Sequence, residues 1–300
     1  MVKYTNKTKK KIKKNKYKQK GGSKKDLTKC APSSDKKHIS CFSKKSLLKI
    51  LEAIKNDNNN IKYSSNENIQ SLWNKINEYF KNVCNDEWCW IEQQIVKNIN
   101  DPELSKYTFR PKMPKKWQYN PHEWLNTLDI ENVMKQYEKK YDDFKFIGPV
   151  PIDFDYQLSP GICVINELCR INVNHLLKKN IKKIGIIFNL DKHDQPGSHW
   201  VALFCDLNKG VYYFDSYGIK PPNEVNVLMD KLIEQNKTNN KMEKKVNSIR
   251  HQFKDSECGV YSMHFIIKFL EGFSFDQITR DKISDDDMFK NRKKYFIKKE

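Results

Sequence analysis

The sequence contains no long apolar run and no ordered spacing of cysteines. No apolar stretch reaches the roughly 18 residues that a membrane-spanning helix requires, and the N-terminus lacks the apolar segment of a signal peptide. We therefore expect a soluble chain with no membrane partner. The eight cysteines show no tight framework, and five of them lie in apolar segments. Most are predicted to be plain buried thiols of a protein in a reducing compartment.

Residues that typically bind metals are also sparse. Cys84 and Cys89 are five positions apart with no paired histidine, and Cys30, His38 and Cys41 form a still weaker group. A structural zinc site needs four cysteine or histidine ligands with characteristic spacing. The sequence therefore predicts neither a metal nor an organic cofactor.

Acidic residues are almost absent from the N-terminal segment. Residues 1–29 hold thirteen lysines against one acid, Asp26, in a chain whose formal net charge is +19. The segment lacks periodic apolar residues, so we expect it to be disordered. Two interpretations stay open. The lysine-rich residues 3–29 attach non-specifically to DNA or to a core nucleoprotein, or they form a solubilising or nuclear-import tail without a specific partner.

The remaining chain divides into a helical part and a mixed part. Apolar residues at helical spacing predict helices over residues 43–56, 66–82 and 86–99, and four prolines then mark a linker over residues 101–122. We expect three units. They are a basic disordered tail over residues 1–40, a helical arm domain over residues 41–111 and a larger domain over residues 112–300.

Residues 258–270 are almost entirely apolar or small and predict a buried helix that ends before Gly272. Asp255 and Ser256 are natural N-cap residues, which would place Cys258 in the first turn. There the unbonded N–H groups and the positive end of the helix dipole favour a thiolate. A lone cysteine in such a helix is more often a small core residue. Partners elsewhere in the chain therefore decide between the two interpretations.

Such partners lie in a predicted β-hairpin. Two runs of aromatic and β-branched residues, 199–207 and 211–217, flank the turn Asn208-Lys209-Gly210. His199 opens the first strand and Asp215 closes the second, so antiparallel pairing would bring them to the same end of the sheet. A cysteine at a helix start, a histidine and an aspartate are the components of an activated-thiol triad.

A glutamine completes the candidate site. Gln252 precedes Cys258 by six residues and would donate a side-chain N–H to an oxyanion, with the backbone N–H of Cys258 as the second donor. We expect a strand over residues 245–253 to deliver it. Further strands over residues 144–154 and 184–190, and helices over 167–179 and 223–235, predict an α+β domain whose mixed sheet packs against the Cys258 helix.

These residues resemble a known family. The order His199-Trp200, Asp215, Gln252 and Cys258-Gly259 resembles the cysteine proteases that include the adenovirus protease and the SUMO-specific proteases. Within that clan the chain is most similar to the polyprotein-processing proteases of large DNA viruses, of the African swine fever virus type. The segments 124–130 and 283–296 resemble the start of that family's catalytic domain and its closing helix. The resemblance covers roughly residues 115–300.

The resemblance implies a papain-like or adenovirus-protease-like α+β fold, with a central buried helix that starts at the nucleophile Cys258. His199, Asp215 and Gln252 would complete the catalytic set without a cofactor. The implied function is a cysteine endopeptidase that cleaves after Gly-Gly in viral capsid or core polyproteins during virion maturation. The implied location is the virion and the virus factory in the host cytoplasm.

Two other functions stay open for this site. One is an isopeptidase that removes SUMO or another ubiquitin-like modifier ending in Gly-Gly, and the other is an inactive module that binds Gly-Gly tails. The pair Gly21-Gly22 before Ser23 is a candidate for self-cleavage, although a glycine pair in a flexible linker is the commoner explanation.

Overall fold

The computed structural model of this chain describes residues 29–34, 39–57, 60–236 and 242–298. The predictions of disorder for residues 1–28 and of self-cleavage after Gly22 lie outside these residues. None of the described helices is long and apolar enough to cross a membrane.

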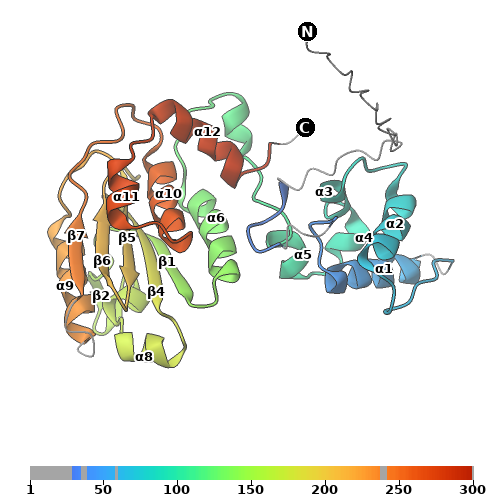
Figure 1. Cartoon of the computed structure of the whole chain (residues 1–300), viewed down its shortest axis with the longest axis horizontal. Coiled ribbons are helices and arrows are strands. Elements are labelled where there is room, and N and C mark those ends of the chain that lie inside the picture. The colour runs from blue at the N-terminus through green and yellow to red at the C-terminus, as the bar shows by residue number, and fades with distance from the viewer. Residues whose placement is uncertain (1–28, 35–38, 58–59, 237–241, 299–300) are drawn as a thin grey trace, which may run out of the picture.

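A five-stranded mixed sheet forms the centre of the larger unit (Figure 1). Its middle strands are antiparallel neighbours, while the outer pairs β1–β4 and β6–β7 are parallel. This confirms the predicted mixed sheet. In spatial order the strands are β1 (Phe144–Pro151), β4 (Lys183–Asn189), β5 (Trp200–Asp206), β6 (Gly210–Phe214) and β7 (Glu243–Val246).

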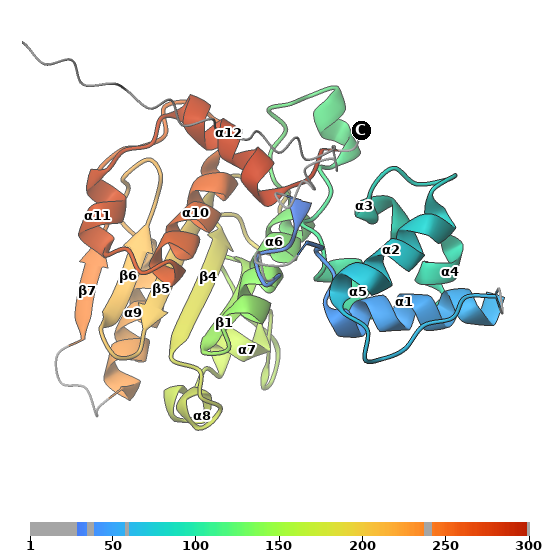
Figure 2. The ribbon, with the colours of Figure 1, turned by 45° about the vertical axis from the view of Figure 1, so that its right-hand side comes forward.

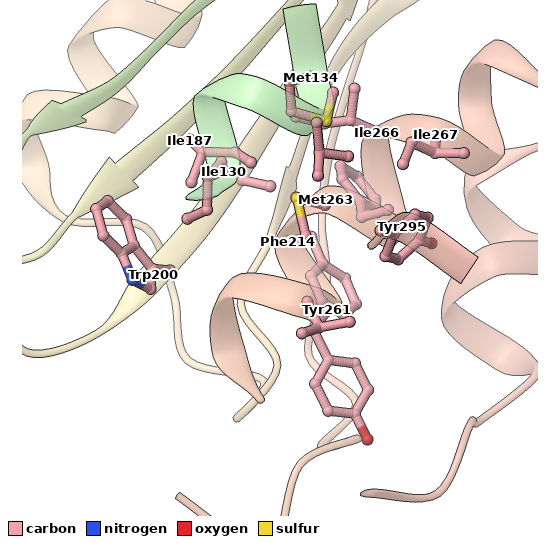
Figure 3. Packing of buried hydrophobic residues seen from close by; sticks show 14 of the residues in the cluster. Ile130, Met134, Ile187, Trp200, Phe214, Tyr261, Met263, Ile266, Ile267 and Tyr295 are labelled. Atoms are coloured by element: carbon pink, nitrogen blue, oxygen red, sulfur yellow. The ribbon is translucent and has the colours of Figure 1, made fainter. Parts of the chain in front are cut away.

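Helix α10 (Cys258–Leu270) packs along one face of this sheet, as the apolar run predicts. Nearly all of its side chains are buried, and Gly272 follows it with a φ of 94°, a backbone conformation that suits glycine at a helix C-terminus. Figure 3 shows Met263 and Ile266 of α10 among the apolar side chains of this core. Each fully buried aliphatic side chain of this size contributes about 1.5–3 kcal/mol to folding.

Three further helices enclose α10, and others cover the opposite face of the sheet. Around α10 lie α6 (Thr127–Lys140), α11 (Phe275–Arg280) and α12 (Asp285–Tyr295). The opposite face has a core of its own, to which α7 (Asn166–Cys169), α8 (Val173–Lys178) and α9 (Asn223–Gln235) contribute. The sheet is therefore buried on both faces, which explains why every residue of β5 and β6 is buried.

Two of the predicted helices are wrong as single elements. The segment 86–99 forms α3 (Glu87–Trp90) and α4 (Gln94–Lys97), and the segment 167–179 forms α7 and α8. In each case polar side chains bond the backbone locally. In the first segment the side chain of Gln93 donates to Cys89 O at 3.2 Å, and α4 begins directly after Gln93. In the second, the side chain of Asn172 accepts the N–H of His175, so α8 starts there.

The N-terminal helices form a separate cluster beside the sheet (Figure 2). Trp90 lies in its core together with side chains from α1 (Lys44–Asp57), α2 (Ile69–Phe80) and α5 (Pro102–Lys106). The linker after α5 includes the 3₁₀ helix η2 (Lys115–Gln118) and pairs with the C-terminal segment, where the Ile297 N–H donates to Pro111 O at 2.8 Å. The predicted boundary between the helical arm domain and the larger domain, at residue 111, stays a prediction.

The predicted tail over residues 1–40 extends too far along the chain. Cys30 and Ala31 are buried against the helical cluster, and Cys30 pairs with Phe109 in an isolated β-bridge. The lysine-rich composition of the preceding residues obscured this contact, because the apolar segment that makes it is only a few residues long.

The prediction that most cysteines are plain thiols is also wrong. Disulfides join Cys30 to Cys41, Cys84 to Cys89 and Cys163 to Cys169. All eight cysteines lie in the described ranges, and Cys205 and Cys258 are the free ones. Local turns bring the bonded Cα atoms to 5.1, 5.4 and 6.3 Å, which lies within the range a disulfide requires. Spacing in the sequence alone does not reveal such turns.

Candidate active site

Cys258 is the first residue of α10, and its side chain is only 2% exposed. The N-cap residue is Glu257, so the prediction that Asp255 or Ser256 caps the helix is wrong. The Glu257 side chain forms no capping bond. It accepts from Ser256 Oγ at 3.0 Å and from Arg292 Nε at 2.8 Å instead. The thiol lies at the N-terminal end of a buried helix, which is the positive end of the helix dipole.

His199 and Asp215 lie at the same end of the sheet, immediately before β5 and immediately after β6. His199 Nε2 is 2.9 Å from Asp215 Oδ1. The carboxylate is 1% exposed and also accepts the backbone N–H of Tyr217 at 2.8 Å. Its other oxygen, Oδ2, is buried and has no hydrogen-bond partner among the described residues. The strand pairing that the hairpin pattern predicts thus brings the two side chains together.

The imidazole also joins the carboxylate to the thiol. Cys258 interacts with the imidazole as well, because the thiol group is among the neighbours that raise the pKa of His199. Burial by itself would lower the pKa of His199, but the bonds to Asp215 and Cys258 and their negative charges raise it to about 9. The histidine is therefore a cation at neutral pH.

Gln252 lies in the loop between β7 and α10, and the predicted strand over residues 245–253 is wrong beyond Val246. The side chain is completely buried. Its Oε1 accepts from Ser216 Oγ at 2.7 Å, and its Nε2 donates to Lys254 O at 2.6 Å. An amide nitrogen carries two hydrogens, so one remains available for an oxyanion.

Asp285 positions the loop that carries Gln252, and the sequence analysis assigned it no role. Its Oδ2 accepts the backbone N–H groups of Phe253 at 2.9 Å and Lys254 at 3.0 Å, and Tyr261 Oη donates to its Oδ1 at 3.2 Å. The contact joins residues about 30 positions apart. One feature of the sequence could have indicated this role: Asp285 starts a helix in the segment that resembles the family's closing helix.

Arg292 is a second buried charge that sequence analysis missed. Its guanidinium donates to Glu257 Oε2 at 2.8 Å and to the Glu123 carbonyl at 2.7 Å, and it lies 4.4 Å from the ring centroid of Trp117. Both charged side chains of the pair are at most 3% exposed. The pair ties α12 to the residue before the nucleophile and to the segment before α6.

Two other histidines, His193 and His264, lie in different surroundings. His193 Nδ1 bonds Asp153 at 2.7 Å in an exposed loop. His264 is buried on α10 beside Tyr295, and burial lowers the pKa of His264 to about 3. Among the described residues, no cluster of three or more histidine, cysteine or acidic side chains could hold a metal ion.

A buried carboxylate, an imidazole and a thiol in a hydrogen-bonded row at a helix start define a cysteine hydrolase. The α+β fold around the row is that of a cysteine protease. Residues 162–300 match the Ulp1 protease family, C-terminal catalytic domain. A protein described as a thiol protease of Acanthamoeba polyphaga mimivirus is 36% identical over 290 residues, which cover 89% of this chain and 92% of the relative. The chain belongs to the Ulp1 family of cysteine proteases, which confirms the predicted resemblance.

Proteases of African swine fever virus are also similar to this chain. The cysteine protease of the Tick/Malawi isolate is 33% identical over 183 residues, which cover 57% of this chain and 67% of the relative. A crystal structure of the protease of this virus superimposes with a TM-score of 0.64 at 22% identity and covers 91% of this chain and 97% of that chain. The predicted fold class is confirmed.

Proposed function

We propose that this cysteine protease is an endopeptidase that cleaves after Gly-Gly in viral capsid or core polyproteins during virion maturation. Cys258 is the nucleophile in this proposal, His199 its acid and base, Asp215 the residue that orients His199, and Gln252 a donor to the oxyanion. The row from Asp215 through His199 to Cys258 carries the proposal. The virion and the virus factory are the proposed locations.

The narrow surroundings of Cys258 support glycine at the cleavage site. The thiol is almost completely buried, and the next residue, Gly259, packs closely against two side chains. A Cβ atom at Gly259 would lie 3.1 Å from Leu125 Cβ and 3.3 Å from Trp200 Cδ1. A substrate backbone reaches such a sulfur most easily where it carries no side chains, and glycine is the residue that meets this condition.

The proposed reaction has two stages. The Cys258 thiolate attacks the substrate carbonyl carbon, and the electron pair of the C=O bond moves to oxygen, where Gln252 Nε2 and the Cys258 N–H donate hydrogen bonds. The oxyanion collapses, the C–N bond breaks, and the His199 imidazolium gives its proton to the departing amine. Water then attacks the acyl-enzyme while His199 accepts a proton, and the thiolate leaves the new carboxylic acid.

An isopeptidase acting on a ubiquitin-like modifier is the second candidate. African swine fever virus proteins described as SUMO-1 cysteine proteases are 32% identical to this chain over 183 residues. A modifier ending in Gly-Gly would present the same narrow backbone to Cys258, so the same site geometry supports both proposals. An inactive Gly-Gly-binding module is disfavoured, because a binder needs neither the imidazole nor the thiol.

Parallel turnover assays distinguish these functions. A Gly-Gly-X peptide is compared with SUMO and ubiquitin that carry a C-terminal fluorogenic amide, and the Cys258→Ala protein serves as blank. Cleavage of the peptide alone supports the processing protease. Faster turnover of a modifier substrate would support the isopeptidase, and full activity of Cys258→Ala would contradict both.

We propose further that residues 3–29 attach the protease to DNA or to a core nucleoprotein. Their thirteen lysines support the proposal, because each phosphate contact releases a counterion and makes binding depend on salt. The test compares DNA affinity at low salt for the full chain and for a chain without residues 2–28. Equal affinities would contradict the proposal.

A further inference from the structure

An open cleft of about 580 Å³ adjoins the catalytic row. Its lining is aromatic and charged, and it comes from the loop after β6, the loop before α10 and the segment before α6. The residues are His122, Tyr217, Arg250, Phe253, Lys254, Asp255 and Ser256.

The cleft adjoins His199, the residue that protonates the leaving group in the proposed reaction. The Tyr217 ring stacks on the His199 imidazole with centroids 4.7 Å apart, and it forms one wall of the cleft. Leu125 and Trp200 are not among the residues that line the cleft, and they lie close to Gly259, the residue after the nucleophile. Since His199 hands its proton to the departing amine in the proposed reaction, the residues that follow the scissile bond pass close to His199, and the cleft walled by Tyr217 is next to it.

Arg250 is the central charge of the cleft. Its guanidinium carbon lies 5.3 Å from the Tyr217 ring centroid and 4.8 Å from that of Phe253. Its Nε donates to Gln252 O at 2.8 Å, which further restricts the side chain. Arg250 forms no ion pair with a carboxylate of the described chain, whereas the neighbouring Lys254 is paired with Asp286 at 2.7 Å.

A guanidinium held in this way is organised for a carboxylate. Its planar fork matches the two carboxylate oxygens, and the flanking rings reduce the entropy lost on binding. Asp255 is the one carboxylate among the lining residues, and Lys254 is already paired with Asp286, so Arg250 is the cation of the lining that an acidic ligand would meet.

We propose that this cleft is the subsite for the first two residues on the leaving-group side of the scissile bond, and that Arg250 selects an acidic side chain there. The inference rests on the proposed cleavage after Gly-Gly and adds the substrate class beyond it. Arg250 acts in binding and takes no part in the proton transfers.

The test uses matched peptides of the type Gly-Gly-Ala-X and Gly-Gly-X-Ala with Glu, Gln or Lys at X. At one of the two positions of X, the full chain should cleave the Glu peptide with a kcat/KM about tenfold above that of the matching Gln peptide. The reason is that charge-assisted hydrogen bonds are stronger than neutral ones. In Arg250→Ala this ratio should fall to about one, and Arg250→Glu should favour Lys. Arg280→Ala, an exposed arginine on α11, is the matched control and should keep the ratio.

Equal cleavage of Glu and Gln peptides by the unaltered chain would overturn the proposal, and so would an unchanged ratio in Arg250→Ala. An equal loss for all peptides in both Arg250 variants would mean that Arg250 acts only by holding Gln252, and would also overturn it. Failure of the proposed function is a separate result, because then no Gly-Gly peptide is cleaved whatever residue stands at X.

Discussion

His199 lies between a carboxylate and a thiol, and its proton decides what the site can do. The pKa of about 9 means that the imidazolium persists through the neutral range. The same shift affects stability. The folded pKa lies above the unfolded value of about 6.5, so the protonated ring stabilises the fold fully below that value. This contribution is lost as the pH rises through about 9.

The alkaline limb of activity should report this group. We expect kcat/KM to fall above a pH of about 9, because a neutral His199 cannot protonate the leaving amine. Asp215→Asn removes a charge that raises the pKa, so its alkaline limb should move to lower pH. The measurement is a pH profile of peptide cleavage for both proteins. An identical alkaline limb in the two would contradict the role of Asp215.

At the scale of elements, α12 controls the loop that delivers Gln252. Asp285 accepts two backbone N–H groups of that loop, and Arg292 pairs with Glu257 at the start of α10. Removing one member of a buried ion pair costs about 3–5 kcal/mol, because the other charge stays buried without a partner. Helix α12, which lies near the end of the sequence, therefore supports the active site.

Asp285→Ala should lower kcat about 10- to 100-fold, because two loop N–H groups lose their acceptor and Gln252 is no longer held in place. Asp285→Asn keeps one acceptor oxygen, so its kcat should fall less than that of Asp285→Ala. The neighbouring Asp286 is exposed and pairs with Lys254, so Asp286→Ala is the matched control and should stay near the original rate. Circular dichroism melting checks that all three variants are folded. An unchanged kcat in folded Asp285→Ala would contradict this role, because the loop that carries Gln252 would then keep its conformation without Asp285.

At the scale of the whole molecule, the helical cluster and the sheet unit have separate cores, and the C-terminal segment joins them. Ile297 belongs to the core of the helical cluster, while the preceding α12 packs on α10. Two of the three disulfides lie within the cluster, and the third holds the strands β2 (Gln157–Ser159) and β3 (Ile162–Cys163) to α7. Each closes a short loop, which is worth about 2–3 kcal/mol.

Thiol counting tests these disulfides directly. Denatured protein prepared without reductant should take up two iodoacetamide labels, on Cys205 and Cys258, and reduction should raise the count to eight. The reduced protein should also melt at a lower temperature, because its unfolded chain is less constrained. The Cys258→Ala protein should show one label fewer in both states. Eight labels before reduction would mean that the chain carries free thiols throughout.

The sequence by itself determined the buried helix that starts at Cys258 and the hairpin that carries His199 and Asp215. Apolar periodicity and turn residues are local signals, and pairing two adjacent strands leaves little freedom in where their ends meet. The tertiary structure alone decided which residues support Gln252, which charge lines the cleft beside His199, and which cysteines are bonded. Asp285 reaches the loop across about 30 residues, and Arg250 is restrained by rings from two different loops. No local pattern encodes such contacts, because they arise only when separate elements pack against one another.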